Sequence, residues 1–139
     1  PPPPPPPPPD PAVADAERRR WTARARAIWL GAQPSLRDTP AAAYLAGRGI
    51  DLASLGRQPR SLRYHSAVVT DGRPWPAMVA CIIATTGGER GRIIGVHRTF
   101  LARSGGMGGD AEAWAKAPLE RPKRILGSLL GGIIPLWRG

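Results

Sequence analysis

Side chains able to perform catalysis are few in this sequence, and none stands in a recognisable catalytic arrangement. The two histidines, His65 and His97, fall within predicted strands, and no cysteine, aspartate or glutamate stands at a metal-ligand spacing from either. The acidic residues form no pair suited to acid–base work, and the motif G-x-S-x-G and the phosphate-binding P-loop are absent. We therefore expect no catalytic residue and no metal site in this chain, and interpret both histidines as structural, one of them a candidate for contact with phosphate.

Basic side chains offer clearer chemistry, because several fall on predicted rigid elements. In a predicted strand over residues 92–101, period-two alternation places Arg92, Ile94, Val96 and Arg98 on one face. Two arginines with apolar residues between them are typical of a groove with an apolar floor and a cationic rim. A return of the chain after a glycine-rich loop would bring three later basic residues beside this strand: Lys116, Lys123 and Arg124.

The charge balance favours a polyanionic partner. The 139 residues include 20 lysines and arginines against 10 aspartates and glutamates, which gives a formal net charge of +10. Such an excess attracts a phosphate backbone of any sequence, and the attraction weakens as salt rises. Only Lys116 and Lys123 are lysines, however, and arginine with abundant alanine, glycine and proline is also what a GC-rich genome produces. Composition alone therefore leaves open both nucleic-acid binding and an effect of base composition.

The single cysteine and the hydropathy pattern limit the cellular compartment in which we expect the protein. Cys81 lies inside the apolar run 78–83, where a small buried side chain is expected, and one cysteine forms neither a disulfide framework nor a zinc cluster. The sequence has no apolar run of about eighteen residues and no signal-peptide pattern. We therefore expect a cytoplasmic protein without a membrane partner.

Proline dominates the start of the chain. A polyproline stretch donates no backbone hydrogen bonds and favours the extended polyproline II helix, so we predict a stiff linker over residues 1–11. The remainder, residues 12–139, has the length of one folded domain. Because the chain begins with Pro1 and not with methionine, we expect it to be a piece of a longer polypeptide.

Hydrophobic spacing predicts two helices before any strand. Over residues 12–30, Trp21, Ala25, Ile28 and Trp29 recur at helical spacing, which predicts that both tryptophans pack inward. A second, short helix is predicted from a cap at 38–40 to the glycines at 47–49. The other face of the first helix carries arginines that either are solvated or follow phosphates: Arg18, Arg19, Arg20, Arg24 and Arg26.

The rest of the domain is predicted to be a small sheet, which makes the fold class α+β: N-terminal helices followed by a small, mainly antiparallel sheet. β-branched and aromatic residues predict the strands, and glycines and prolines predict the turns between them. We expect strands at 62–65, 76–84 and 92–101, turns at 71–74 and 86–89, a flexible glycine-rich loop at 102–110, one helical turn at 114–118, and short edge strands at 124–126 and 133–136.

Five short segments resemble, in their order and spacing, the domain that precedes the Toprim domain in phage, plasmid and alphaproteobacterial primase or primase-helicase-like proteins. They are Tyr44-Leu45-Ala46-Gly47-Arg48-Gly49-Ile50, Leu62-Arg63-Tyr64-His65, Pro76-Ala77-Met78-Val79-Ala80, Gly95-Val96-His97-Arg98-Thr99-Phe100-Leu101 and Pro122-Lys123-Arg124-Ile125-Leu126-Gly127. More distantly, the same order is similar to the N-terminal subdomain of the bacterial primase polymerase core. In that core, Gly-Arg-Val-Ile-Gly stands where this chain has Gly91-Arg92-Ile93-Ile94-Gly95.

The resemblance implies that basic residues of this domain face a single-stranded template and a nascent primer, beside the metal-binding carboxylates of a Toprim domain. The nucleic-acid-binding residues predicted in this way are Arg48, Arg92, Arg98, Lys123 and Arg124. Trp75 and Trp114 are candidates for stacking against bases. One departure concerns Arg98: His97-Arg98-Thr99 stands where the primase core has Gly-Gly-Arg, which shifts the arginine by one position and puts its facing in question.

The expected function is that of a DNA replication accessory module: the template-facing, single-stranded DNA-binding part of a primase-like Toprim protein. No zinc finger and no Toprim motif is present in the sequence, so Mg²⁺ and nucleotidyl transfer are expected only with a Toprim domain, and this chain alone holds no cofactor. Expected partners are single-stranded DNA or a DNA/RNA primer-template, and a Toprim domain or replicative helicase. The alternative is a non-catalytic scaffold that packs against a Toprim or helicase partner.

Overall fold

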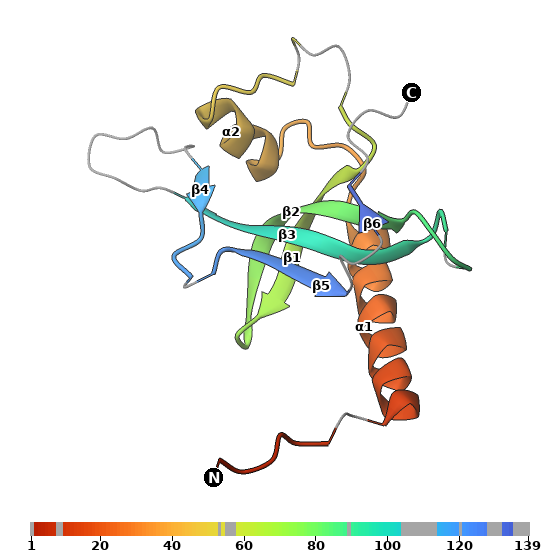
Figure 1. Cartoon of the computed structure of the whole chain (residues 1–139). Helices are drawn as coiled ribbons and strands as arrows, with labels where there is room; N and C mark the ends of the chain where they lie inside the picture. Colours follow the sequence, from red (N-terminus) through yellow and green to blue (C-terminus); the bar gives the residue numbers. More distant parts are fainter. Residues whose placement is uncertain are drawn as a thin grey trace.

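The structure is a computed structural model that describes residues 2–7, 10–52, 54, 58–88, 90–103, 114–119, 121–127 and 132–134. Within these ranges two helices precede six strands, which form one antiparallel sheet (Figure 1). The predicted α+β class is confirmed. Residues 2–7 of the proline-rich segment are exposed and form neither helix nor strand. No helix in the described part of the chain is long and apolar enough to cross a membrane.

The first helix, α1 (Pro11–Gly31), begins at a capping residue and a proline. The Asp10 carboxylate accepts a hydrogen bond from the Ala12 amide at 2.9 Å. Trp29 is buried as predicted, but Trp21 is 42% exposed, so the prediction that both tryptophans pack inward is wrong for Trp21. The reason is that the sheet covers the C-terminal part of α1, while its N-terminal part extends beyond the sheet (Figure 1).

The second helix, α2 (Pro40–Gly47), starts and stops where the sequence predicts. The Thr39 side chain accepts a hydrogen bond from the Ala42 amide at 3.4 Å, and Pro40 takes the first helical position. After the helix, Gly49 adopts a φ of 85°, which a residue without a Cβ atom reaches without strain.

Three long strands form the centre of the sheet. They are β1 (Leu62–Thr70), β2 (Arg73–Ala84) and β3 (Ile93–Arg103), paired antiparallel in chain order. Asp71 and Gly72 connect β1 to β2 with φ angles of 52° and 75°, as a two-residue hairpin turn requires. The pairing between β1 and β2 continues up to this turn, so both strands are longer than the sequence pattern predicts.

The short strands complete the two edges. β5 (Lys123–Gly127) and β4 (Trp114–Lys116) pair one after the other with the outer edge of β3, and β6 (Gly132–Ile133) pairs with β2. The predicted helical turn at 114–118 is wrong, because the backbone of β4 pairs with the end of β3 at Leu101–Arg103. Of the predicted loop at 102–110, the first two residues belong to β3 and the rest lies outside the described residues.

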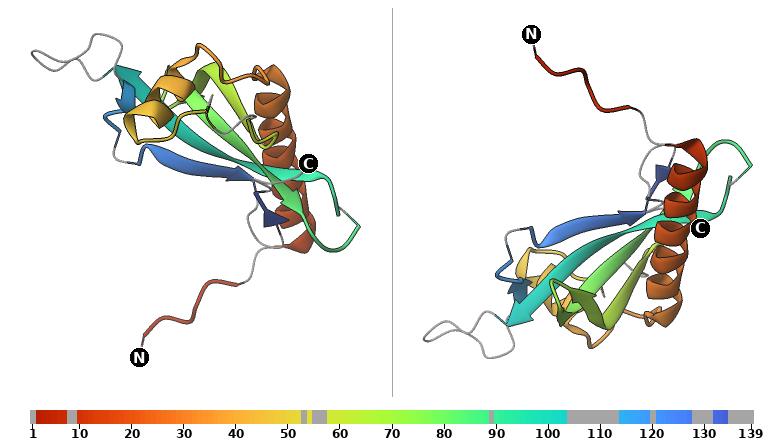
Figure 2. Two further views of the ribbon diagram at one scale, coloured as in Figure 1. Left: turned by 90° about the horizontal axis from the view of Figure 1, so that it is seen from above. Right: turned by 90° about the horizontal axis from the view of Figure 1, so that it is seen from below.

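The two helices cover opposite faces of the sheet (Figure 2). On the α1 side, Val96 and Phe100 are fully buried against Ala25 and Trp29. On the α2 side, Leu101 is buried in a second cluster, which is completed by Leu36, Ala41, Tyr44 and Leu45. Cys81 is buried in the α1-side core, as expected for an unreactive small side chain.

A β-bulge interrupts the alternation of β3. The register between β2 and β3 shifts between Ile82 and Ile83, so Ile93 packs in the α1-side core while Ile94 packs with Ile82 in a separate cluster. The predicted common face of Ile94 and Val96 is therefore wrong. Gly127 of β5 lies against this bulge with a φ of 97°, and a Cβ atom there would come within 2.4 Å of the Ile94 carbonyl oxygen.

Candidate nucleic-acid interface

The basic residues singled out in the sequence do not share one face of the sheet. In the β3–β5 pairing, Arg98 lies opposite Arg124 and Thr99 lies opposite Lys123. Because neighbours on a strand point to opposite faces, Arg98 and Arg124 lie on the α1 side and Lys123 lies on the α2 side. Arg92 is exposed and directly precedes β3.

On the α2 side, three cations from three different elements come together: Arg48, Lys116 and Lys123, here called the α2-side strip. Arg48 caps α2, with its guanidinium 5.7 Å from the centre of the Tyr44 ring. The positive charge of Lys123 lowers the pKa of Lys116, and partial desolvation and the charge of Arg48 act in the same direction. All three side chains are exposed, and none forms an ion pair with another described residue.

His97 lies on the same face as Lys123. Burial lowers the pKa of the His97 imidazole, and the positive charges of Lys123 and Arg98 lower it further. Both effects favour the neutral form of the imidazole over the charged form. Among the described residues no group of three histidine, cysteine, aspartate or glutamate side chains is placed to hold a metal ion.

On the α1 side, Arg98 and Arg124 lie over the Phe100 ring, and the charge of Arg24 on α1 acts on Arg98; these three residues are here called the arginine cluster. The guanidinium carbons of Arg98 and Arg124 lie 5.3 and 5.8 Å from the centre of the Phe100 ring. Burial lowers the pKa of Arg98, and the positive charges of Arg124 and of Arg24 on α1 lower it further. Arg24 itself lies over Trp21, 5.4 Å from the ring centre.

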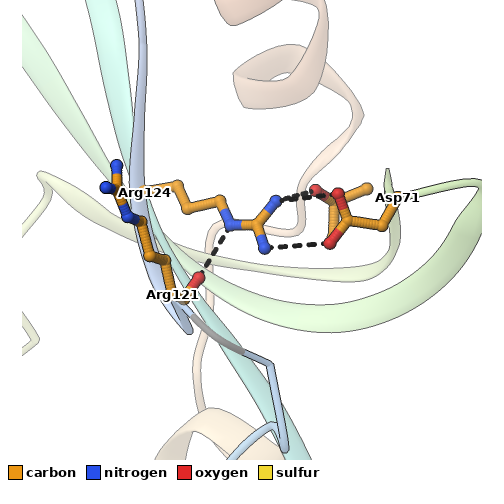
Figure 3. A network of polar contacts seen from close by, with 4 residues as sticks. Asp71, Arg121 and Arg124 are labelled. Atoms are coloured by element: carbon orange, nitrogen blue, oxygen red, sulfur yellow. Dashed lines mark hydrogen bonds and ion pairs between the residues drawn. The ribbon is translucent and has the colours of Figure 1, made fainter.

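Arg124 is the one member of the cluster that contacts an acid within the described part of the chain. Its guanidinium donates to both carboxylate oxygens of Asp71, at 3.2 and 2.9 Å, and to the Thr70 hydroxyl at 2.7 Å (Figure 3). Its Nε donates to the Arg121 carbonyl at 2.7 Å (Figure 3). The hydrogen bond from Arg124 lowers the pKa of Asp71. Sequence reasoning missed this pairing, because nothing in a turn of the type Asp-Gly indicates which distant strand it contacts.

Other arginines have structural partners. Arg26 of α1 donates from Nε to the Ile93 carbonyl at 2.8 Å, and so joins the helix to the sheet. Arg63 donates to the Trp29 carbonyl at 2.9 Å and stacks 4.2 Å from the centre of the Trp29 ring. The polar face of α1 is therefore mixed: Arg26 packs on the sheet, while Arg18, Arg19 and Arg20 are exposed.

The two tryptophans considered for base stacking are half-buried, and each has an arginine over its ring. Arg73 lies 4.6 Å from the centre of the Trp75 ring, and Arg103 lies 5.7 Å from that of Trp114. The Trp75 indole nitrogen is buried and has no hydrogen-bond acceptor among the described residues. Stacking of a base on either ring would need the arginine to move or to sandwich the base, and it stays a prediction.

Fold and site together define a small, basic α+β domain with cationic groups on both faces of one antiparallel sheet. The chain belongs to the family described as Domain of unknown function (DUF7146), whose model matches residues 19–136. That range contains every residue of the α2-side strip and of the arginine cluster. No curated protein and no solved structure matches the chain.

Proposed function

We propose that this domain binds single-stranded DNA as the template-facing part of a primase-like Toprim protein. The observation that carries the proposal is the α2-side strip, where Arg48, Lys116 and Lys123 meet without an acidic partner among the described residues. The resemblance of five ordered segments to the domain that precedes Toprim domains supports the same assignment. The contribution of this chain would be to bind and position the strand, with DNA synthesis left to the Toprim domain.

The electrostatics of the strip suit a phosphate backbone. The charges of Lys123 and Arg48, which lower the pKa of Lys116, also create a local positive potential, and a polyanion neutralises such a potential with release of its counterions. The strip rests on rigid elements, because Arg48 caps α2 and the lysines belong to β4 and β5. The backbone positions that carry these side chains are therefore fixed, which favours binding to a strand that must be presented in one register.

The proposal is tested by fluorescence anisotropy with a labelled oligothymidine at two salt concentrations. The variant Lys116→Gln, Lys123→Gln should bind about tenfold more weakly, and its salt slope should fall by about 0.7 for each phosphate that the variant no longer neutralises. The matched control is Arg19→Gln, Arg60→Gln, which removes the same charge from exposed positions outside the strip. Equal weakening in both variants, or no weakening in either, would exclude the strip as the binding surface.

A scaffold role is the second candidate, favoured by an apolar side chain beside the strip. Ile125 is 43% exposed and lies on the same face of β5 as Lys123. A Toprim domain or helicase that packs there would cover Ile125. Ile125→Glu should then abolish co-purification with a separately expressed Toprim domain and leave DNA affinity at the wild-type level, whereas loss of DNA binding alone would favour the first candidate.

A further inference from the structure

Within the described part of the chain, the three cations of the arginine cluster contact one acidic side chain, Asp71. Asp71 pairs with Arg124, while Arg24 and Arg98 form no ion pair and no hydrogen bond with any described residue. The Nε of Arg98 is buried without an acceptor among these residues. A donor of this kind is uncommon, because leaving a buried charged group unsatisfied is strongly unfavourable.

The surroundings of Arg98 increase this cost. Arg124 and Arg24 are close enough for their positive charges to act on the Arg98 guanidinium, and the ring below it, Phe100, is fully buried. Stacking on one aromatic ring contributes only about 0.5 to 2 kcal/mol, which does not offset partial burial between two like charges. The arrangement therefore has the electrostatics of a binding site for an anion.

We propose that Arg24, Arg98 and Arg124 form a binding site for a phosphate group on the α1 side of the sheet. The site is separate from the α2-side strip and lies on the opposite face, and it does not depend on the proposed function. Arg98 would donate from the outer nitrogens of its guanidinium, Arg24 would approach from α1, and Arg124 would contribute charge while Asp71 holds its orientation.

Phosphate suits these residues better than other common anions do. Planar guanidinium groups donate two parallel hydrogen bonds to phosphate oxygens, and three of them with the paired Asp71 carboxylate leave a net positive charge that suits a terminal phosphate. The phosphate could belong to a free nucleotide or to a nucleic-acid strand. The two sources share the same chemistry at the site, so the experiment must separate them.

The first measurement uses the buried Arg98 Nε–H as a reporter. In a proton–nitrogen NMR spectrum of the whole chain, its resonance is assigned from the signal missing in Arg98→Lys. Titration with sodium pyrophosphate in a phosphate-free buffer should shift this resonance, because the phosphate binds the guanidinium group to which this nitrogen belongs. Pyrophosphate is added up to about 10 mM, a concentration at which even weak binding becomes visible. If the resonance does not shift over this range, the proposal is overturned.

Thermal unfolding supplies a second readout with a matched control. Pyrophosphate should raise the Tm of the wild type, because a ligand that binds only the folded state stabilises it. Arg24→Gln changes an exposed side chain and removes a like charge near Arg98, so the Tm without ligand should be equal or higher, while pyrophosphate affinity falls about tenfold. Arg19→Gln, on the same helix, should retain the wild-type response.

Arg98→Met tests whether Arg98 serves the ligand or the fold. Methionine keeps most of the apolar contact with Phe100 and removes the charge, so the Tm should be equal or higher while the response to pyrophosphate is abolished. A lower Tm with an unchanged pyrophosphate response would assign Arg98 to the fold and overturn the proposal.

The source of the phosphate is decided by comparing ligands at the same reporter. A nucleoside triphosphate that shifts the Arg98 resonance more strongly than an unphosphorylated oligothymidine identifies a nucleotide site. The reverse order identifies a backbone site. If the oligothymidine binds through the strip alone, the variant Lys116→Gln, Lys123→Gln binds DNA more weakly but keeps the pyrophosphate response, so failures of the two proposals are distinguishable.

Discussion

Arg124 on β5 and Asp71 in the β1–β2 turn form a two-contact ion pair, although 53 residues separate them in the sequence. The pair joins the hairpin that starts the sheet to a strand that closes its other edge. Arg124 reaches the turn by passing over Phe100. The same contact therefore orients one arginine of the proposed phosphate site and ties two distant parts of the fold together.

Acidification should weaken this contact. The pKa of Asp71 is lowered in the folded state, so its contribution to stability is complete above the unfolded pKa of about 4 and is lost as pH falls through the folded value. The Tm of the wild type should fall more steeply between pH 5 and about pH 3 than that of Asp71→Asn. Asp15→Asn, which removes an exposed pair within α1, controls for the loss of a negative charge.

Gly127 should be the least replaceable glycine among those described. Its φ of 97° is unfavourable for other residues, and a Cβ atom would lie 2.4 Å from the Ile94 carbonyl oxygen. Gly127→Ala should cost about 2 to 4 kcal/mol of unfolding free energy, measured by urea denaturation. Gly49→Ala is the control: its φ is also positive, but its Cβ atom would meet no atom within 4 Å, so about 1 kcal/mol is expected.

Much of the fold could be predicted from local sequence signals. Some elements follow from the physical properties of a few neighbouring residues, and the structure confirms each of them. They are the helix cap at Thr39 and Pro40, the Asp71–Gly72 turn, and the strands β2 and β3 with their β-branched residues. The segment that begins at Trp114 is different, because three residues are too few to show the hydrophobic spacing that distinguishes a strand from a helical turn. Only pairing with the end of β3 makes that segment a strand.

The candidate site is less accessible from sequence, because it depends on register and facing. Alternation in β3 predicts the common face of Val96 and Arg98, but no sequence signal reveals the bulge that moves Ile94 to another cluster. The electrostatic effect of Arg24 on Arg98 also depends on where α1 crosses the sheet. Helical spacing gives the faces of α1 but not the point at which the sheet stops covering it.

The two tryptophans of α1 should differ sharply in their effect on stability. Trp29 is 6% exposed and packs against Ala25 and Val96 in the α1-side core, whereas Trp21 is 42% exposed and contacts Arg24. Trp29→Ala should cost about 3 to 5 kcal/mol by urea denaturation, and Trp21→Ala less than about 1 kcal/mol. Similar losses of stability for both variants would mean that the sheet covers the whole helix.

The histidines should make the protein less stable below neutral pH. Burial lowers the pKa of His65 and His97, and the charges of Lys123 and Arg98 add to the effect at His97. As the pH falls, the histidines bind protons more readily in the unfolded state than in the folded state. Their contribution to the free energy of unfolding is therefore fully present above the unfolded pKa of about 6.5, and it is lost as the pH falls through that value toward the folded pKa. Urea denaturation at pH 8 and about pH 5.5 measures this loss. The chain has two histidines, and the double variant His65→Gln, His97→Gln removes both. This variant should show almost the same free energy of unfolding at both pH values. If it loses as much stability as the wild type does, the pH dependence comes from the carboxylates instead.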